Sequence, residues 1–294
     1  MSSNPKKLKI AVFPVAGMGT RFLPATKASP KEMLPIVDKP LIQYAAEEAV
    51  NAGIETLIFI TGRNKFSIPN HFDKAYEIET ELERRNKAKE LELVKNILPK
   101  NVKCIYIRQN QALGLGHAVL CSKPAVGDNP FAVILADDMI LSSENGCLKQ
   151  MVNRFEELNS SIIAVEKVKK ELLNKYGIIE GVKDNNDWTL TNIIEKPDIN
   201  SAPSEMGVVG RYILKPSIFN ILESTSKGTG DEIQLTDAIA DQIKQEKVYA
   251  YEFEGKRFDC GSKIGFLKAT IEYALHHDEI SGELKEYLKN ISLD

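Results

Sequence analysis

Short apolar runs alternate with segments of helical periodicity over the first part of this chain, up to about residue 136. The runs are rich in β-branched residues and have the length of buried strands; they cover residues 8–15, 56–61, 102–108 and 131–136. Helical patterns fill the intervals, at residues 42–50, 70–98 and 116–122. Strands that alternate with helices form parallel sheets with helices on both faces. The pattern therefore predicts an α/β fold.

The pattern changes after residue 160. Shorter apolar runs follow, separated by turn-forming residues, at 161–168, 177–182, 190–195 and 208–214. From Ile264 onward the chain is again helical in pattern. We therefore expect a mixed, mostly parallel sheet flanked by helices, in which the second part of the chain extends or covers the first.

The composition excludes several classes of protein. A net charge of −3 in 294 residues leaves no general basic surface for nucleic acid. The N-terminal segment is polar and has no long apolar run, so we expect neither a signal peptide nor a membrane span. The four cysteines lack the spacing of a zinc site and indicate free thiols in a reducing cytoplasm.

A loop with two glycines follows the first predicted strand directly, in AGMGTRFLPATKASPKEMLP. Such glycines let the backbone approach phosphate groups, although a bare tight turn explains them equally well. A dinucleotide fold would need a third glycine where Phe22 stands, and the GxxxxGK[ST] pattern of a P-loop is absent. The loop also carries three cations among its prolines: Arg21, Lys27 and Lys31. Prolines stiffen the backbone, so we expect them to hold these cations in fixed positions along the loop. Cations held in this way suit nucleotidyl transfer, which depends mostly on positioning and charge neutralisation.

The loop GMGTRFLPATKASPKEMLP resembles the GxGTR…P…K signature of the sugar nucleotidyltransferases. The longer segment PATKASPKEMLPIVDKPLIQY is similar to the uridylyltransferase branch of that family, bacterial enzymes that use UTP and glucose 1-phosphate. The likeness continues over about residues 8–277, in RQNQALGLGHAVL, ILADD, IIEKP, VVGRY, GDEIQLTDAI and FDCGSK. The resemblance implies transfer of UMP from UTP to glucose 1-phosphate, giving UDP-glucose and pyrophosphate.

The resemblance also implies one domain over residues 1–294, with a Rossmann-like nucleotidyltransferase fold. About residues 8–136 would bind the nucleotide, about 137–260 would bind the sugar, and about 261–294 would form C-terminal helices. Members of the family depend on Mg²⁺ and assemble as a homodimer or a homotetramer, which we expect here.

The glycine loop carries the phosphate-binding residues that the resemblance implies. These are Ala16, Gly17 and Gly19 in the loop itself, with Arg21 and Lys31 on the triphosphate and the departing pyrophosphate.

Gln109 and Gly114 match the family positions that bind the uridine. An amide can donate to and accept from the imide edge of uracil, and glycine lets the backbone approach a base. From the residues alone, a plain loop followed by a helix is the better explanation of this segment.

Asp137 and Asp138 directly follow a predicted buried strand. A carboxylate at the C-terminal end of a parallel strand lies where α/β sheets bind ligands, and Mg²⁺ usually takes one or two carboxylates plus phosphate oxygens. A simple turn is the alternative for this pair. The resemblance assigns Asp137 to the metal, places Asp138 toward the sugar or as a cap, and matches Asp259 with a second metal aspartate.

Glu195 and Lys196 end another predicted strand, just before Pro197. Successive strand residues point to opposite faces, so both side chains can serve one pocket only if the strand ends or bends there. A surface strand end is the alternative. The resemblance assigns Glu195 to sugar hydroxyls, Lys196 to a phosphate, and Gly177 and Gly210 to the sugar pocket.

Two other functions fit the same motifs. A thymidylyltransferase acts on dTTP and glucose 1-phosphate, and the methyl group of thymine is the only difference between the two bases. A non-catalytic sensor of nucleotide sugars, a protein of a different class, would keep the pocket without the reaction. The presence of Arg21, Lys31, Asp137 and Lys196 together favours catalysis, because a sensor does not need every charged group.

Overall fold

The computed structural model describes residues 6–142 and 144–292. Its strands in chain order are β1 (Ile10–Val15), β2 (Pro35–Ile36), β3 (Lys39–Pro40), β4 (Thr56–Thr61), β5 (Lys103–Arg108), β6 (Phe131–Ile134), β7 (Asp138–Leu141), β8 (Ser161–Lys167), β9 (Gly177–Asp184), β10 (Asp187–Glu195), β11 (Met206–Leu214), β12 (Val248–Glu252) and β13 (Lys256–Asp259). The main sheet has nine strands in the order β5-β4-β1-β6-β11-β8-β12-β10-β9. The small sheets pair β13 with β7 and β2 with β3.

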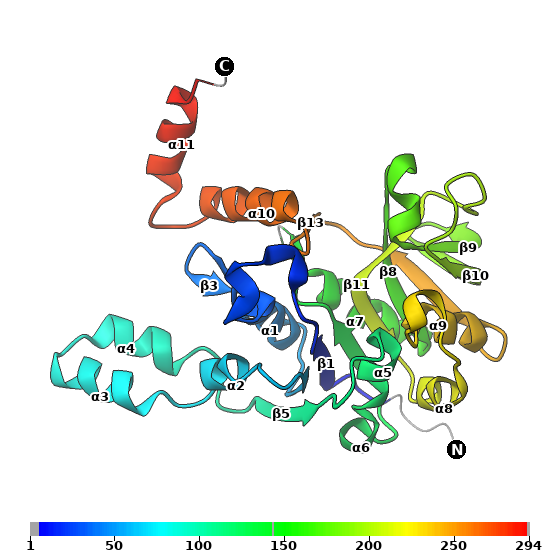
Figure 1. The fold of residues 1–294 in the computed structure, drawn as a ribbon, viewed down its shortest axis with the longest axis horizontal. Helices are drawn as coiled ribbons and strands as arrows, with labels where there is room; N and C mark the ends of the chain where they lie inside the picture. Colours follow the sequence, from blue (N-terminus) through cyan, green and yellow to red (C-terminus); the bar gives the residue numbers. More distant parts are fainter. Residues whose placement is uncertain (1–5, 143, 293–294) are drawn as a thin grey trace.

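The helices are α1 (Leu41–Asn51), α2 (Ser67–Phe72), α3 (Tyr76–Arg84), α4 (Ala88–Lys95), α5 (Leu115–Leu120), α6 (Lys123–Val126), α7 (Cys147–Leu158), α8 (Ser217–Ser224), α9 (Leu235–Ile243), α10 (Lys263–Leu275) and α11 (Ser281–Asn290). Figure 1 shows two arms that extend away from the sheet, one formed by α3 and α4 and the other by α10 and α11. In the part of the chain that the structure describes, no helix is long and apolar enough to cross a membrane.

Helices cover both faces of the main sheet, as the apolar runs predicted (Figure 1). Alternate residues of β1 point to opposite faces: Phe13 packs in a cluster with α1 and α7, whereas Val12 packs in a cluster with α5, α8 and α9. Both side chains are fully buried. A strand buried on both faces has a continuous apolar sequence, which explains the apolar runs in the first part of the chain.

The sheet is mixed, and parallel pairing is confined to two regions. β5, β4, β1 and β6 are parallel to one another, and β8 is parallel to β12. β11 runs antiparallel to both β6 and β8, and β10 runs antiparallel to β12 and β9. The prediction of a mixed sheet flanked by helices is confirmed. Its description as mostly parallel was too strong, because hairpins and returning strands replace the strand–helix–strand units after β6.

The second half of the sheet closes on itself at β11. The N-terminal part of β11 pairs with β9 as well as with β8, so β11, β8, β12, β10 and β9 form a ring. A register shift between Val208 and Tyr212 separates that part from the segment that pairs with β6. β11 is therefore the strand that joins the parallel half of the sheet to the ring.

Two local predictions are confirmed in detail. α1 begins directly after Pro40 and ends before Gly53, which has a φ of +95°. Residues 70–98 are largely helical, but they fold back on themselves as α3 and α4, with Asn86 at a φ of +59° between the two helices.

Candidate active site

The glycine loop leaves the C-terminal end of β1 and folds back over Lys31. Gly19 has a φ of +68°, and the hydroxyl of Thr26 donates to its carbonyl oxygen at 2.7 Å. A Cβ atom at Gly19 would lie 3.2 Å from Cβ of Lys31, so a side chain would be both strained and crowded there. The loop thereby brings its backbone against the stem of Lys31.

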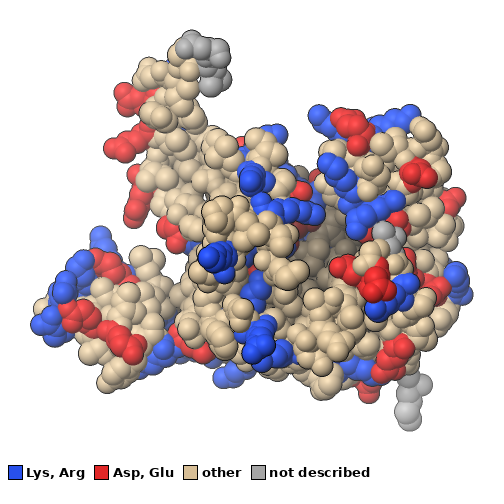
Figure 2. Space-filling view, viewed as in Figure 1, with Lys and Arg blue, Asp and Glu red and all other residues tan. Residues whose placement is uncertain are grey.

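Two adjoining cavities lie along this edge of the sheet. We call the first the nucleotide cavity: it has a volume of about 480 Å³ and lies at the ends of β1 and β5. Of the residues predicted from the sequence, it is lined by Ala16, Gly17, Gly19, Arg21, Lys31, Gln109, Gly114 and Asp137. Figure 2 shows this face of the molecule hollowed near its centre, with Lys and Arg atoms at the edge of the hollow.

The second, the sugar cavity, has a volume of about 670 Å³ and lies between the ends of β10 and β13 and the middle of β11. The remaining predicted residues line it: Asp138, Gly177, Glu195, Lys196, Gly210 and Asp259. Arg21 and Asp137 line both cavities. The fold therefore gathers every predicted site residue around one continuous depression, with a cation and a carboxylate at the junction.

Lys31 and Asp137 form an ion pair at that junction, with Nζ 2.6 Å from Oδ2, and each side chain is about one quarter exposed. Burial lowers the pKa of Lys31, but the charges of Asp137 and Glu32 outweigh it and raise this pKa above its usual value. Burial likewise raises the pKa of Asp137, and Lys31 outweighs it and lowers this pKa. Both groups are therefore charged near neutral pH.

Asp259 reaches the same place because β13 pairs with β7, which sets Asp259 opposite Asp138. The Asp259 and Asp137 carboxylates converge on Gly261, where an added Cβ would lie 2.9 Å from Asp259 Oδ1 and 3.1 Å from Asp137 Oδ2. Arg21 Nη1 lies 3.5 Å from the Gly261 carbonyl oxygen. Among residues 6–142 and 144–292, no cluster of three or more His, Cys, Asp or Glu side chains could by itself hold a metal ion.

Asp138 differs from its neighbour, because protein groups bind both of its oxygens. Oδ2 accepts from the backbone N–H of Gly210 at 2.7 Å, and Oδ1 accepts from Arg257. Arg257 also donates to Glu166 at 2.7 Å and to the hydroxyl of Tyr176 at 3.2 Å. Asp138 lines the sugar cavity and, with Arg257, holds together the wall formed by β7, β11 and β13.

Glu195 and Lys196 both line the sugar cavity, which requires that the strand end or bend between them. β10 ends at Glu195, and Lys196 has a φ of +47°, which turns the chain out of the extended conformation. The Lys196 ammonium lies 3.0 Å from the Glu195 carboxylate. Successive residues thus reach one pocket because the backbone bends between them.

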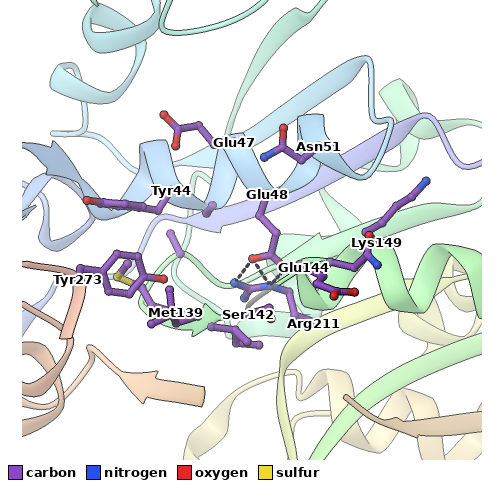
Figure 3. A pocket seen from close by; sticks show the side chains of 16 residues that line it. Tyr44, Glu47, Glu48, Asn51, Met139, Ser142, Glu144, Lys149, Arg211 and Tyr273 are labelled. Atoms are coloured by element: carbon purple, nitrogen blue, oxygen red, sulfur yellow. Dashed lines mark hydrogen bonds and ion pairs between the residues drawn. The ribbon is translucent and has the colours of Figure 1, made fainter. Parts of the chain in front are cut away.

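Behind the Asp137 loop lies a further cavity of about 350 Å³, whose floor is an ion pair (Figure 3). Figure 3 shows Glu48 of α1 reaching Arg211 of β11, and Arg211 Nη2 lies 2.7 Å from Glu48 Oε2. Arg211 Nη1 also donates to the carbonyl oxygens of Leu135 and Gly210, at 3.1 and 3.0 Å. This buried guanidinium fixes the backbone on which Asp137 and Asp138 stand.

Two features differ from what the residues alone suggested. Lys27 does not line the nucleotide cavity with Arg21 and Lys31. It lines a separate small cavity on the other side of the glycine loop. Arg257 and Arg211 were not predicted. Arg211 leaves a signal in the sequence, as an isolated arginine inside an apolar run, whereas Arg257 follows Lys256 in a polar segment and leaves none. Both arginines depend on partners more than 100 residues away.

A family model described as nucleotidyl transferase matches residues 11–275. The chain belongs to the nucleotidyl transferase family. A UTP–glucose-1-phosphate uridylyltransferase of Staphylococcus epidermidis is 47% identical to it over 289 residues, which cover 98% of this chain and 100% of that protein. The resemblance stated from the motifs is confirmed.

Solved structures agree with this assignment. A UTP-bound UGPase from Acinetobacter baumannii superimposes with a TM-score of 0.91 at 43% identity, over 97% of this chain and 100% of that chain. A UDP-glucose pyrophosphorylase complexed with UDP-glucose has a TM-score of 0.85 at 46% identity, over 92% of this chain and 100% of that chain.

Proposed function

We propose that the chain transfers UMP from UTP to glucose 1-phosphate and releases pyrophosphate, forming UDP-glucose. The observation that carries the proposal is that the nucleotide and sugar cavities share Arg21 and Asp137. Ligands in the two cavities would meet at a cation and a carboxylate, where a nucleotidyl group can pass between them. The solved relatives bound to UTP and to UDP-glucose support this pair of substrates.

UTP occupies the nucleotide cavity in this proposal. The strand order β5-β4-β1-β6, with the first strand central, supports the expected Rossmann-like character of this half. Gly17 and Gly19 approach the phosphates, while Arg21 and Lys31 neutralise the triphosphate and the departing pyrophosphate. Gln109, in the wall of the cavity, reads the base.

Glucose 1-phosphate occupies the sugar cavity, with Glu195 on its hydroxyls and Lys196 on its phosphate. A phosphate oxygen of the sugar attacks the α-phosphorus of UTP. The bond from that phosphorus to the oxygen bridging to the β-phosphate breaks, and pyrophosphate leaves. The attacking phosphate is already ionised near neutral pH, so the site needs alignment and charge neutralisation and no general base.

Asp137 and Asp259 are the residues that we propose to hold Mg²⁺. Their carboxylates converge at Gly261, where a side chain would fill the space between them, and two carboxylates fit an ion that completes its coordination with phosphates and water. When bound, Mg²⁺ neutralises phosphate oxygens and helps to orient them.

Asp137→Asn should therefore weaken the use of Mg²⁺ more than the recognition of UTP. The measurement is a Mg²⁺ titration of the rate at saturating substrates, beside UTP affinity by calorimetry. Lys27→Ala, on the other side of the loop, is the control. An unchanged Mg²⁺ curve and rate in Asp137→Asn would move the metal site to other residues.

The proposal also includes the oligomeric state of the enzyme and its cellular compartment. The outer face of α10 exposes Ile264, Leu267 and Ile271 to solvent, and this apolar stripe supports a homodimer or homotetramer. All four cysteines lie in the described part of the chain and are free thiols, which supports a reducing cytoplasm.

A pyrophosphate-release assay tests the proposed reaction directly. Wild-type protein with Mg²⁺, UTP and glucose 1-phosphate should release pyrophosphate, and dTTP in place of UTP should give a lower kcat/KM. A higher kcat/KM with dTTP would make the protein a thymidylyltransferase. Tight binding of UDP-glucose without release of pyrophosphate would make it a sensor of nucleotide sugars.

A further inference from the structure

Gln109 is held in place at the wall of the nucleotide cavity. Its backbone N–H donates to the carbonyl oxygen of Thr61 at 2.9 Å, which continues the pairing of β5 with β4 by one residue. Its side chain is almost completely buried, with an exposed fraction of 8%. The amide nitrogen Nε2 lies 3.2 Å from the carbonyl oxygen of Gly114 and 2.9 Å from Nδ1 of His117.

These two contacts determine which way the amide faces and which tautomer the histidine adopts. A backbone carbonyl can only accept a hydrogen bond, so the group facing Gly114 must be the NH₂ of Gln109. The second N–H then points at Nδ1 of His117, which must accept it. His117 is therefore neutral and carries its proton on Nε2.

The amide oxygen of Gln109, Oε1, is in a different position from the amide nitrogen. Both N–H groups of the amide are used inside the protein, and among the described residues Oε1 has no hydrogen-bond partner. In the cavity that Gln109 lines, the amide is thus available only as an acceptor. The N3 position of uracil carries a hydrogen and donates, whereas N3 of cytosine has a lone pair and accepts.

We propose that His117 is a positioning residue that sets the preference for uracil over cytosine, because it locks the Gln109 amide with its acceptor toward the base. The inference deepens the proposed function, in which UTP occupies this cavity. Gly114 and His117 stand at the start and in the first turn of α5, so the helix delivers both acceptors as one unit. Cytosine would face Oε1 with a second acceptor and leave both groups unpaired.

Replacing His117 tests whether it holds the Gln109 amide in this orientation. In His117→Ala the second N–H loses its acceptor, and the preference for UTP over CTP, as a ratio of kcat/KM values, should fall about tenfold. The kcat at saturating UTP should stay within about twofold of wild type, because the phosphates and the sugar are untouched. His117→Asn, whose carbonyl can accept the same hydrogen bond, should restore most of the preference.

Cys121→Ala is the matched control: Cys121 directly follows the last residue of α5, its sulfur lies 4.0 Å from His117 Nδ1, and it does not contact the Gln109 amide. It should keep the wild-type ratio. An unchanged ratio in a folded His117→Ala variant overturns the proposal, as does an equal fall in Cys121→Ala.

A measurement on the wild-type protein needs no variant to fold. The ¹⁵N chemical shifts of the His117 ring should show a protonated Nε2 and an unprotonated Nδ1, and a protonated Nδ1 overturns the proposal. Calorimetry with UTP and CTP separates this inference from the reaction. A protein that binds UTP more tightly than CTP but releases no pyrophosphate would keep the base selection and lose the proposed activity.

Discussion

Arg21 lies where the two cavities meet, two residues after Gly19, whose left-handed conformation turns the loop back on itself. Its guanidinium approaches the carbonyl oxygen of Gly261 and lines both cavities, whereas Lys27 on the same loop lines neither of them. In the proposed reaction, a cation in this place would counter the charge that builds up on the departing pyrophosphate. Two cations six residues apart thus have different surroundings.

Arg21→Ala should keep the fold and lose turnover, with kcat reduced by about 10²–10³, the cost of removing one such donor. Lys27→Ala should stay close to wild type. Steady-state kinetics of pyrophosphate release, with circular dichroism as a check of folding, measures both. Near-normal kcat in a folded Arg21→Ala protein would remove Arg21 from the mechanism.

Glu195 and Lys196 are neighbours with separate tasks in the proposed reaction. Glu195→Gln should impair the use of glucose 1-phosphate and leave UTP binding nearly intact, because in the proposed reaction the carboxylate binds neutral hydroxyls of the sugar. Lys196→Ala should lower kcat, because the phosphate charge that it meets shifts during the reaction. Calorimetry with UTP and kinetics with both substrates distinguish the two. If Lys196→Ala raises only the KM for the sugar phosphate, the lysine contributes uniform binding.

At the scale of elements, the glycine loop is anchored to the segment that follows β4. Lys65 in that segment forms a buried ion pair with Glu32, at 2.7 Å, directly beside Lys31. Burial raises the pKa of Glu32, although the charges of Lys65 and Lys31 oppose it. One oxygen of Glu32 has no partner within the described residues. The pair positions the loop at a considerable cost in desolvation.

Removing one partner of this pair should be far more harmful than removing both. Lys65→Met should lower the free energy of unfolding by about 3–5 kcal/mol, because it leaves Glu32 buried without a counter-ion. Lys65→Met combined with Glu32→Leu should recover most of that loss. Lys123→Met, which breaks an exposed ion pair with Glu223, should cost no more than about 1 kcal/mol. Denaturant unfolding measures all three, and a double variant no more stable than Lys65→Met would contradict the argument.

At the scale of the whole molecule, β11 connects two kinds of sheet. One end of this strand pairs with β6 of the parallel half, and the other end completes the ring with β8 and β9. Gly210 lies between these ends, where a Cβ would come within 2.7 Å of Leu135 and 2.9 Å of Asp138. The two cavities adjoin because this glycine lets the Asp137 loop lie directly on β11. The α10–α11 arm leaves the same region and exposes its apolar stripe.

A charge on the α10 stripe should disrupt assembly and leave the monomer folded. Leu267 and Ile271 are 53% and 37% exposed, so changing both to Glu costs little in the monomer but would bury two charges in an interface. The double variant should elute as a smaller species than wild type in size-exclusion chromatography with light scattering. Leu93→Glu on the other arm, where the side chain is 75% exposed, is the control. Equal masses for wild type and the α10 variant would place the interface elsewhere.

Local sequence determined the elements that depend on neighbouring residues. β1, α1 and β4 follow from apolar periodicity and from Pro40 and Gly53, because a strand or a helix end is decided within a few residues. Polar groups directly after apolar runs marked Asp137, Asp138, Glu195 and Lys196 as candidates, but the resemblance to the family assigned the site residues their roles. Carboxyl ends of parallel strands share one edge, so groups that follow β1, β5 and β6 converge there. Strand β10 runs antiparallel to its neighbours, so this rule does not bring Glu195 and Lys196 to the site.

Only the tertiary structure decided how the second half of the sheet closes and which charges meet. Arg211 meets Glu48 across 163 residues and Arg257 meets Asp138 across 119, and nothing in the sequence pairs either arginine with its carboxylate. The path of the loop likewise decided that Lys27 lines a separate small cavity and not the nucleotide cavity. Strand order and the pairing of buried charges depend on which distant segments become neighbours, and an ion pair forms only after packing has removed both partners from water.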